Sequence, residues 1–274
     1  MKAKVPLDVQ FLVIEWVYRS SQHRRIDYRP LRMCALICKA WTPIAQRLLI
    51  RRVPNGTLET RSHDERPIVC LLRTLRAAPH LAAHVRTFLK SAYLNLDTDW
   101  QEQELTALAL CANVQSVVFV GLLRTSNVSP ELYTRLEAIP IRPKFIRITA
   151  EASQINRVIK IWPSVRALQV FAWSCTQADL PVQMPRALQA LSTSFSCIPL
   201  LWPAPGAVPP MLHDLDLDCR KEEDMTRPAV LASGVFAQLR TLRIWGDTCA
   251  RVLPAAVIEQ LAVLDSHHQS PPYQ

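Results

Sequence analysis

The stretch Val5–Val53, VPLDVQFLVIEWVYRSSQHRRIDYRPLRMCALICKAWTPIAQRLLIRRV, decides how the rest of the chain is interpreted. It predicts three short helices, because Pro6 and Pro43 suit first helical turns and apolar residues recur at three- and four-residue steps. A unit of this size lies below that at which a domain is comfortably stable alone. Its apolar residues exceed what it can bury by itself, so we expect some of them to face a partner.

The positive charge of the chain is concentrated in the same region. The net charge is +9 over 274 residues, and residues 1–53 carry eleven Lys and Arg against three Asp and Glu, a net charge of +8. Such a module can meet an acidic protein, a nucleic acid or an anionic membrane. These charges fall at helix ends and in one loop, not along one helical face. That distribution favours an acidic protein partner or plain solvation over nucleic acid.

The composition predicts a folded intracellular protein. Apolar residues make up 49% and charged residues 20%, which is ordinary for a globular chain. The eight cysteines are scattered singly, as free buried thiols are in a reducing compartment. No export signal or membrane-spanning run is apparent. We therefore expect a cytoplasmic and/or nuclear protein.

Two short motifs in the opening stretch carry a family resemblance. The first is Val5-Pro6-Leu7-Asp8-Val9 and the second is Ile37-Cys38-Lys39-Ala40-Trp41. They resemble Leu-Pro-x-Glu-Ile/Leu and Val-Cys-Lys-x-Trp of the F-box, a three-helix motif that binds a Skp-type adaptor in cullin-based ubiquitin ligases. The segment Arg19–Arg29 is longer and more basic than the usual turn, and in this it resembles F-box-like proteins of mushroom-forming fungi.

The resemblance implies which side chains face the adaptor. The implied adaptor-binding residues are Pro6, Val9, Val13, Val17, Leu31, Ile37, Cys38, Trp41 and Leu49. It also implies a cullin as an indirect partner. The chain would then be a receptor that needs no catalytic residue of its own.

The rest of the chain repeats one pattern, in which an apolar residue is followed three and five residues later by two more. Clear copies start at Val114, Val165, Leu212 and Leu239. Weaker copies start at Val85, Phe145, Leu188 and Leu261. The steps between starts are 29, 31, 20, 23, 24, 27 and 22 residues, close to the 20–29 residues of a leucine-rich repeat. A generic α/β fold with buried strands remains the alternative.

These patterns predict an α/β chain in which a small three-helix F-box precedes an irregular leucine-rich-repeat-like solenoid. The expected boundaries are residues 1–53 for the F-box, 54–84 for connecting helices, 85–265 for the array and 266–274 for a disordered tail. Helical patterns between strands are expected at Ile68–Leu75, Gln101–Leu110 and Ile155–Ile161.

Outward strand positions of such an array form its recognition surface. The expected target-binding residues are Arg166, Gln169, His213, Asp214, Asp216, Arg240, Arg243 and Trp245. Arg86, Gln115, Gln189 and Asp218 are expected at further outward positions. Asp214, Asp216 and Asp218 form an acidic row beside Arg240 and Arg243, and these opposite charges either pair with one another or meet a ligand.

No cofactor, metal site or active site is predicted. Cys34 and Cys38 share one helix face but lack a second ligand pair, so burial is favoured. His80 and His84 have helical spacing without the Glu of a zinc hydrolase. Asp97, Asp99, Glu102 and Glu104 are typical of an acidic first helical turn. Phosphate-binding and dinucleotide-binding motifs are absent.

The sequence therefore predicts a non-enzymatic substrate receptor of a Skp–cullin–F-box ubiquitin ligase, whose repeats bind an unidentified target protein. One alternative is a non-ubiquitin, repeat-based scaffold whose N-terminal helices only cap the array. The other is a nucleic-acid binder that uses the basic Arg19–Arg52 region. Neither nucleic acid nor a membrane is the expected partner.

Overall fold

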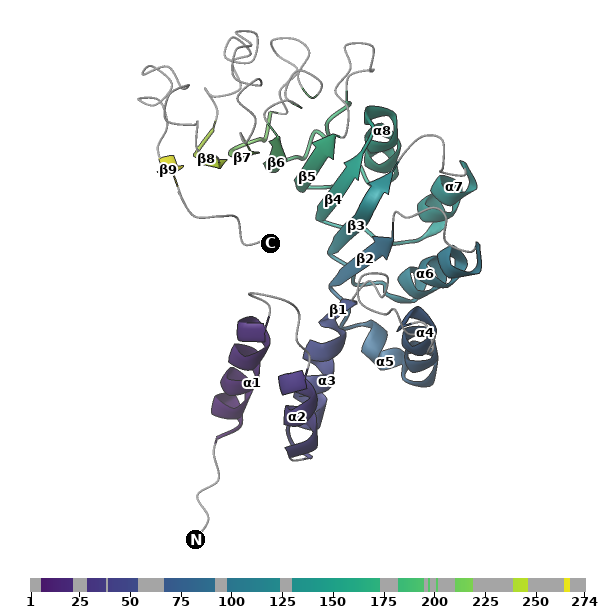
Figure 1. Ribbon diagram of the computed structural model, residues 1–274, viewed down its shortest axis with the longest axis vertical. Coiled ribbons are helices and arrows are strands. Elements are labelled where there is room, and N and C mark those ends of the chain that lie inside the picture. Colours follow the sequence, from purple (N-terminus) through teal and green to yellow (C-terminus); the bar gives the residue numbers. More distant parts are fainter. Residues whose placement is uncertain are drawn as a thin grey trace.

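The computed structural model describes residues 6–21, 29–37, 39–53, 67–91, 98–123, 130–172, 182–194, 197, 201, 210–218, 239–245 and 264–266. A three-helix unit lies at one end and a curved parallel sheet follows it (Figure 1). The helices are α1 (Leu7–Ser21), α2 (Arg29–Ile37), α3 (Thr42–Arg51), α4 (Pro67–Ala77), α5 (Pro79–Ala82), α6 (Thr98–Leu110), α7 (Pro130–Ala138) and α8 (Ala152–Ile161). The strands are β1 (Arg52–Val53), β2 (Thr87–Ser91), β3 (Ser116–Leu123), β4 (Phe145–Ala150), β5 (Ala167–Ala172), β6 (Ala190–Ser194), β7 (Asp214–Asp218), β8 (Thr241–Trp245) and β9 (Leu264–Ser266).

The three predicted helices of the opening stretch are present and pack on one another. Their common core is small and consists of Ile14, Leu31, Cys34, Ala45 and Leu48. Pro6 immediately precedes α1, and its carbonyl accepts the Gln10 N–H at 3.1 Å, which closes the first turn. The Thr42 hydroxyl donates to the Ala35 carbonyl at 2.8 Å and ties the start of α3 to α2.

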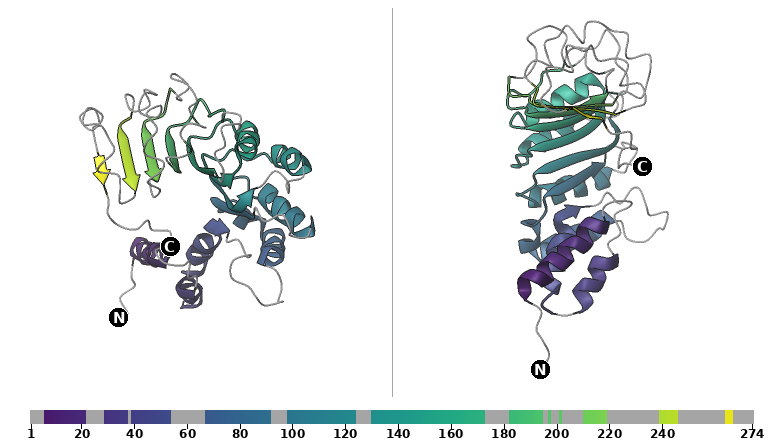
Figure 2. Two further views of the ribbon diagram at one scale, coloured as in Figure 1. Left: turned by 45° about the horizontal axis from the view of Figure 1, so that its top comes forward. Right: turned by 90° about the vertical axis from the view of Figure 1, so that its left-hand side faces the viewer.

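The sheet is wholly parallel, and its nine strands follow one another in sequence order from β1 to β9. Parallel neighbours need a crossover between them, and α4, α6, α7 and α8 lie in such crossovers on the outer, convex side (Figures 1 and 2). The predicted α/β class is confirmed. Helices are also found where the 3.6-residue pattern predicted them before β2, β3 and β5.

The repeated apolar pattern corresponds to a continuous core row across the sheet. Strand register places one buried side chain from each of seven strands in this row, namely Phe88, Val117, Ile146, Leu168, Leu191, Leu215 and Leu242. Side chains alternate between faces along a strand, so the next residue of each strand points to the concave face. One copy of the pattern was predicted in the wrong register. Phe145 is half-buried, and Ile146, Ile148 and Ala150 are the buried residues of β4.

The predicted boundary at residue 85 is also wrong. The sheet already begins at Arg52, where β1 follows α3 without a break and pairs with β2. Ile68, Leu72 and Leu75 of α4 belong to the same core as the strands, so this helix is the first crossover of the array and not a separate connector. At the other end, β9 extends through Ser266. The rest of the predicted tail lies outside the described residues.

Four polar or charged side chains are buried among the described residues, namely Lys90, Glu104, Gln154 and Thr193. Lys90 occupies a core position of β2, and its Nζ lies 2.6 Å from Glu104 Oε2 on α6, with both side chains almost completely buried. Glu104 was predicted to belong to an acidic first helical turn, and the structure places it further along α6, as the buried partner of a lysine. Thr193 of β6 is fully buried, and its hydroxyl has no hydrogen-bond partner among the described residues.

Candidate interaction surfaces

The helical unit presents most of the exposed apolar surface. Among the described residues, ten large apolar side chains are exposed, and eight of them lie on α1 and α2, so the exposure is concentrated and not scattered. These eight are Val9, Phe11, Leu12, Val13, Trp16, Met33, Leu36 and Ile37. The most exposed are Leu36 at 80% and Trp16 at 68% of their possible area. We call these eight residues the apolar face.

The apolar face stays exposed because α1 contacts its neighbours through a narrow strip. Ile14 is the buried residue of this helix, and Gln10 and Val17 are half-buried beside it, at helical steps of four and three residues. The Trp41 indole donates its Nε1–H to the Gln10 side-chain oxygen at 2.6 Å. This hydrogen bond and the contacts of Ile14 both lie on the side of α1 that faces α2 and α3. The apolar residues on the other sides of α1 remain in solvent.

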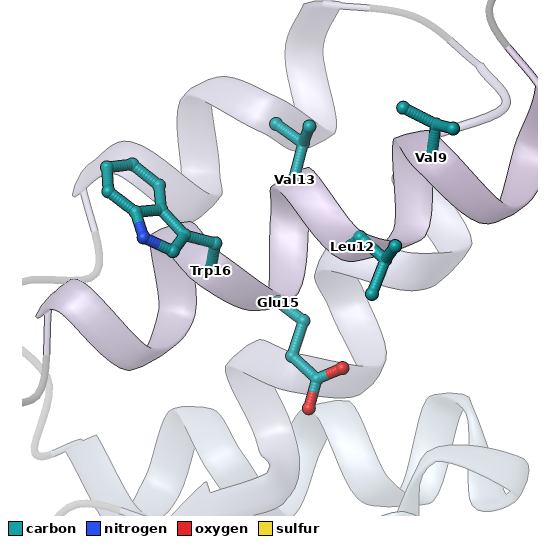
Figure 3. A pocket seen from close by; sticks show the side chains of 5 residues that line it. All are labelled: Val9, Leu12, Val13, Glu15 and Trp16. Atoms are coloured by element: carbon teal, nitrogen blue, oxygen red, sulfur yellow. The ribbon is translucent and has the colours of Figure 1, made fainter.

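A shallow groove of about 460 Å³ runs along the exposed side of α1. The described residues that line it are Val9, Leu12, Val13, Glu15 and Trp16, and Figure 3 shows their side chains spread along the helix. Glu15 is its one charged member. A groove of this composition suits an apolar side chain or helix of a partner.

The structure separates the predicted adaptor-binding residues by exposure. Pro6, Val9, Val13 and Ile37 are exposed, and Val17, Trp41 and Leu49 are half-buried against the helical core. Leu31 is fully buried, so it stabilises the unit and has no surface to offer; the prediction for this residue is corrected. Cys38 lies outside the described residues.

Five members of the apolar face were missing from the predicted adaptor-binding set. They are Phe11, Leu12, Trp16, Met33 and Leu36, and all but Phe11 are more than half exposed. Leu12 and Trp16 belong to the apolar stripe that predicted α1. The spacing of that stripe did not reveal which side of it contacts α2 and α3.

A second candidate surface is the concave face of the sheet. Strand register places Arg147, Gln169, Ser192, Asp216 and Arg243 in one row across β4 to β8. The Gln169 amide donates to the Ser192 hydroxyl at 3.4 Å, and the Arg147 guanidinium lies 6.0 Å from the centre of the Phe171 ring. The row contains both signs of charge, because Arg147 and Arg243 are basic and Asp216 is acidic.

The acidic residues of β7 lie where the sequence predicted them. Asp214, Asp216 and Asp218 alternate with buried leucines, and register sets Asp216 beside Arg243 of β8. Trp245 is aligned with Asp218, but its side chain lies outside the described residues.

Three predicted members of the target-binding set are not on this concave face. Arg166, His213 and Arg240 come immediately before β5, β7 and β8, at the amino-terminal edge of the sheet. Arg86, Gln115 and Gln189 come just before β2, β3 and β6 in the same way. The repeated motif begins one residue earlier than these positions, and its first apolar residue is buried before the strand itself starts. The sequence pattern did not show that offset.

The described residues offer no cluster of three or more His, Cys, Asp or Glu side chains that could hold a metal ion. Burial raises the pKa of the Cys111 thiol to about 12 and also raises the pKa of Cys34, so both thiols are protonated and poor nucleophiles near neutral pH. His80 and His84 lie at the surface beside Arg86. Burial, followed by the positive charges of Arg47, Arg86 and His80, lowers the pKa of His84.

Comparison of the sequence with models of protein families finds no match, and comparison with curated proteins finds no similar sequence. Among the described residues, no helix is both long and apolar enough to cross a membrane. The two motifs of the opening stretch and the surfaces described above are therefore the features that bear on function.

Proposed function

We propose that this chain is the substrate-recognition subunit of a Skp–cullin–F-box ubiquitin ligase. The helical unit α1–α3 acts as an F-box that binds a Skp-type adaptor, and the sheet with its crossovers acts as a leucine-rich-repeat-like solenoid that binds a target protein. The chain holds the target near an enzyme of the complex that carries ubiquitin. Catalysis is then by proximity, and the covalent steps occur in other subunits.

The observation that carries this proposal is the apolar face. A solvent-exposed tryptophan beside several leucine-sized side chains is costly to leave in water, and each such side chain gains about 1.5–3 kcal/mol when it becomes fully buried. Aromatic anchors at the centre of an interface usually dominate its energy. The first F-box-like motif spans the start of α1, and the second begins at Ile37, the last residue of α2. The face lies on these two helices, so a Skp-type adaptor is the partner that fits both features.

The concave face supports the second half of the proposal. It offers a row of half-buried and exposed polar groups on a rigid sheet, in which Asp216 and Arg243 set a local pattern of charge. Patterns of mixed sign give specificity for a protein surface of complementary charge.

The alternative is a binding scaffold whose helical unit only caps the array. In its favour, Ile50 of α3 packs against the core of the sheet and α3 runs directly into β1. A cap, however, covers the apolar end of a repeat array with its own apolar side chains. Here α1 and α2 keep Trp16 and Leu36 in solvent. That arrangement favours an external partner.

The test is titration of the full chain with a purified Skp-type adaptor by calorimetry. Trp16→Asp and Leu36→Asp should each weaken binding by about 2 kcal/mol or more, roughly thirtyfold, because each puts a charge into the apolar interface. Met211→Asp is the matched control, because Met211 is also exposed and apolar but lies in the turn before β7. The affinity of the Met211→Asp variant for the adaptor should equal that of the parent chain.

Trp41 is a less decisive position, because it is half-buried and hydrogen-bonded to Gln10 within the unit. Its replacement would disturb the fold together with any interface.

A folded parent chain that does not bind the adaptor would contradict the ligase proposal. The scaffold function would then be the one that remains.

A further inference from the structure

Beyond the adaptor and target surfaces, a ladder of backbone hydrogen bonds fixes the amino-terminal edge of the sheet. The Arg86 carbonyl accepts two N–H groups, from Gln115 at 2.8 Å and from Ser116 at 3.0 Å. The same double contact recurs at each later step of the ladder. The residues whose carbonyls accept in this way are Arg86, Gln115, Lys144, Arg166, Gln189 and His213.

This ladder defines a column of eight residues, one before each strand from β2 to β8 and one at the end of α3. The members are Arg51, Arg86, Gln115, Lys144, Arg166, Gln189, His213 and Arg240. Neighbouring members are held at the strand spacing of about 4.8 Å, so the column spans roughly 34 Å. Because the backbone is fixed at each step, the column presents its side chains as an ordered row.

The column carries charge of one sign. Five of its eight members are Lys or Arg and none is Asp or Glu, whereas the concave face mixes both signs. We call the five residues Arg51, Arg86, Lys144, Arg166 and Arg240 the basic edge. Arg142 and Arg186 are exposed in the turns just before the column and add to its charge.

Most of the basic edge is exposed. Arg51, Lys144, Arg166 and Arg240 are exposed, and the half-buried Arg86 donates its Nη1–H to the Asn113 carbonyl at 3.1 Å. No ion pair joins Lys144, Arg166 or Arg240 to another described residue. The Asp214 carboxylate lies 3.2 Å from Nδ1 of the His213 ring, which is a member of the column but not of the basic edge. The charge of the edge is therefore largely uncompensated within this part of the chain.

We infer that the basic edge is a binding site for an extended acidic polypeptide segment, separate from both the apolar face and the concave face. A row of about 34 Å matches roughly ten residues of extended peptide at 3.3–3.4 Å each. Arginine and lysine fit carboxylates directly. Single-stranded nucleic acid is less well matched, because it relies on exposed aromatic rings for stacking. Near this edge, Trp162 is buried and Phe145, which follows Lys144, is half-buried.

The experiment uses the full chain and a fluorescein-labelled peptide of ten glutamates, with affinity followed by anisotropy. The parent chain should bind the peptide, and binding should weaken steeply between about 50 mM and 300 mM NaCl as the charges are screened. Lys144→Glu combined with Arg166→Glu reverses two adjacent members of the column. We expect this variant to bind at least about tenfold more weakly.

Two controls make the result decisive. Arg32→Glu combined with Lys39→Glu changes the net charge equally at exposed positions away from the edge, and should alter affinity by less than about threefold. If the charge-reversal variant does not fold, as judged by circular dichroism, the milder variant Lys144→Gln/Arg166→Gln replaces it.

Equal losses of peptide affinity in the edge and control variants would overturn the inference. Tighter binding of a ten-nucleotide oligothymidine, lost in the same edge variants, would overturn it in favour of nucleic acid. Neither outcome depends on whether the adaptor binds.

Discussion

In the helical unit, five buried side chains form the core, whereas the core beneath the sheet draws on α4 to α8 and on seven strands. The two regions also differ in what they leave exposed. The helical unit keeps eight large apolar side chains in solvent, and the concave face and the edge of the sheet expose polar and charged groups. A region that buries little and exposes much apolar surface is typical of one completed by a partner. From β1 to β5, the sheet is covered by the helices of its own crossovers.

The largest expected effect concerns the buried ion pair of the sheet. Lys90→Met should cost about 3–5 kcal/mol in the free energy of unfolding, because it leaves the Glu104 carboxylate buried without its partner. The double variant Lys90→Met/Glu104→Leu should recover most of that loss. Urea unfolding of the three proteins measures both. A single variant as stable as the parent chain would show that the sheet tolerates a lone buried charge.

The second prediction compares two leucines of α2. Leu31→Ala removes a fully buried side chain and should destabilise the helical unit by about 3 kcal/mol. Leu36→Ala alters an exposed position and should change stability by less than about 0.5 kcal/mol. Hydrogen exchange of the α1–α3 amides reports on each. Equal costs at the two positions would mean that the apolar face is packed within the chain, and the contrast between the regions would fail.

A smaller, stabilising effect is expected at Thr193. Its hydroxyl is buried between aliphatic neighbours without a hydrogen-bond partner among the described residues, so Thr193→Val should raise the unfolding free energy by about 1 kcal/mol. Thr241→Val, at a half-buried position on the concave face of β8, is the matched control and should gain little. Thermal unfolding distinguishes the two. A loss of stability in Thr193→Val would reveal a polar contact of the hydroxyl.

The smallest effect tests the junction between the regions, where His84 lies near Arg47 of α3 and Arg86, which comes just before β2. The pKa of His84 is lowered from 6.5 on folding, so the unfolded chain binds this proton more tightly. Stability should therefore decrease as the pH falls below 6.5. The drop in Tm between about pH 7.5 and pH 5.5 should be smaller in His84→Gln than in the parent chain. An identical drop would place His84 away from these charges.

Much of the fold could be predicted because local patterns carry it. Apolar residues three and five positions apart marked the strands, and Pro6 marked the start of α1. Errors arose where a pattern fits more than one register. Phe145 and Ile146 are both apolar, and only pairing with β3 and β5 settles which of them faces the core. The two-residue strand β1 has no pattern of its own and exists because β2 pairs with it.

The candidate surfaces were predicted less completely. The acidic alternation of β7 followed directly from its sequence, since strand periodicity sets the face of each side chain. By contrast, Leu31 and Leu36 belong to one helix and have the same chemistry, yet one is fully buried and the other is 80% exposed. That difference depends on where α1 and α3 lie against α2. The basic edge likewise joins residues from Arg51 to Arg240 that are far apart in the chain.

The sequence by itself determined six of the helices, the order of the strands β2 to β9 along the chain and the excess of apolar residues in the opening stretch. Each of these follows from near-neighbour spacing and composition. Tertiary structure alone decided which of those apolar residues remain in solvent. It also decided that Lys90 meets Glu104 and that five basic residues form one row. These outcomes depend on contacts between distant segments, whose geometry is set when the strands pair and the helices pack.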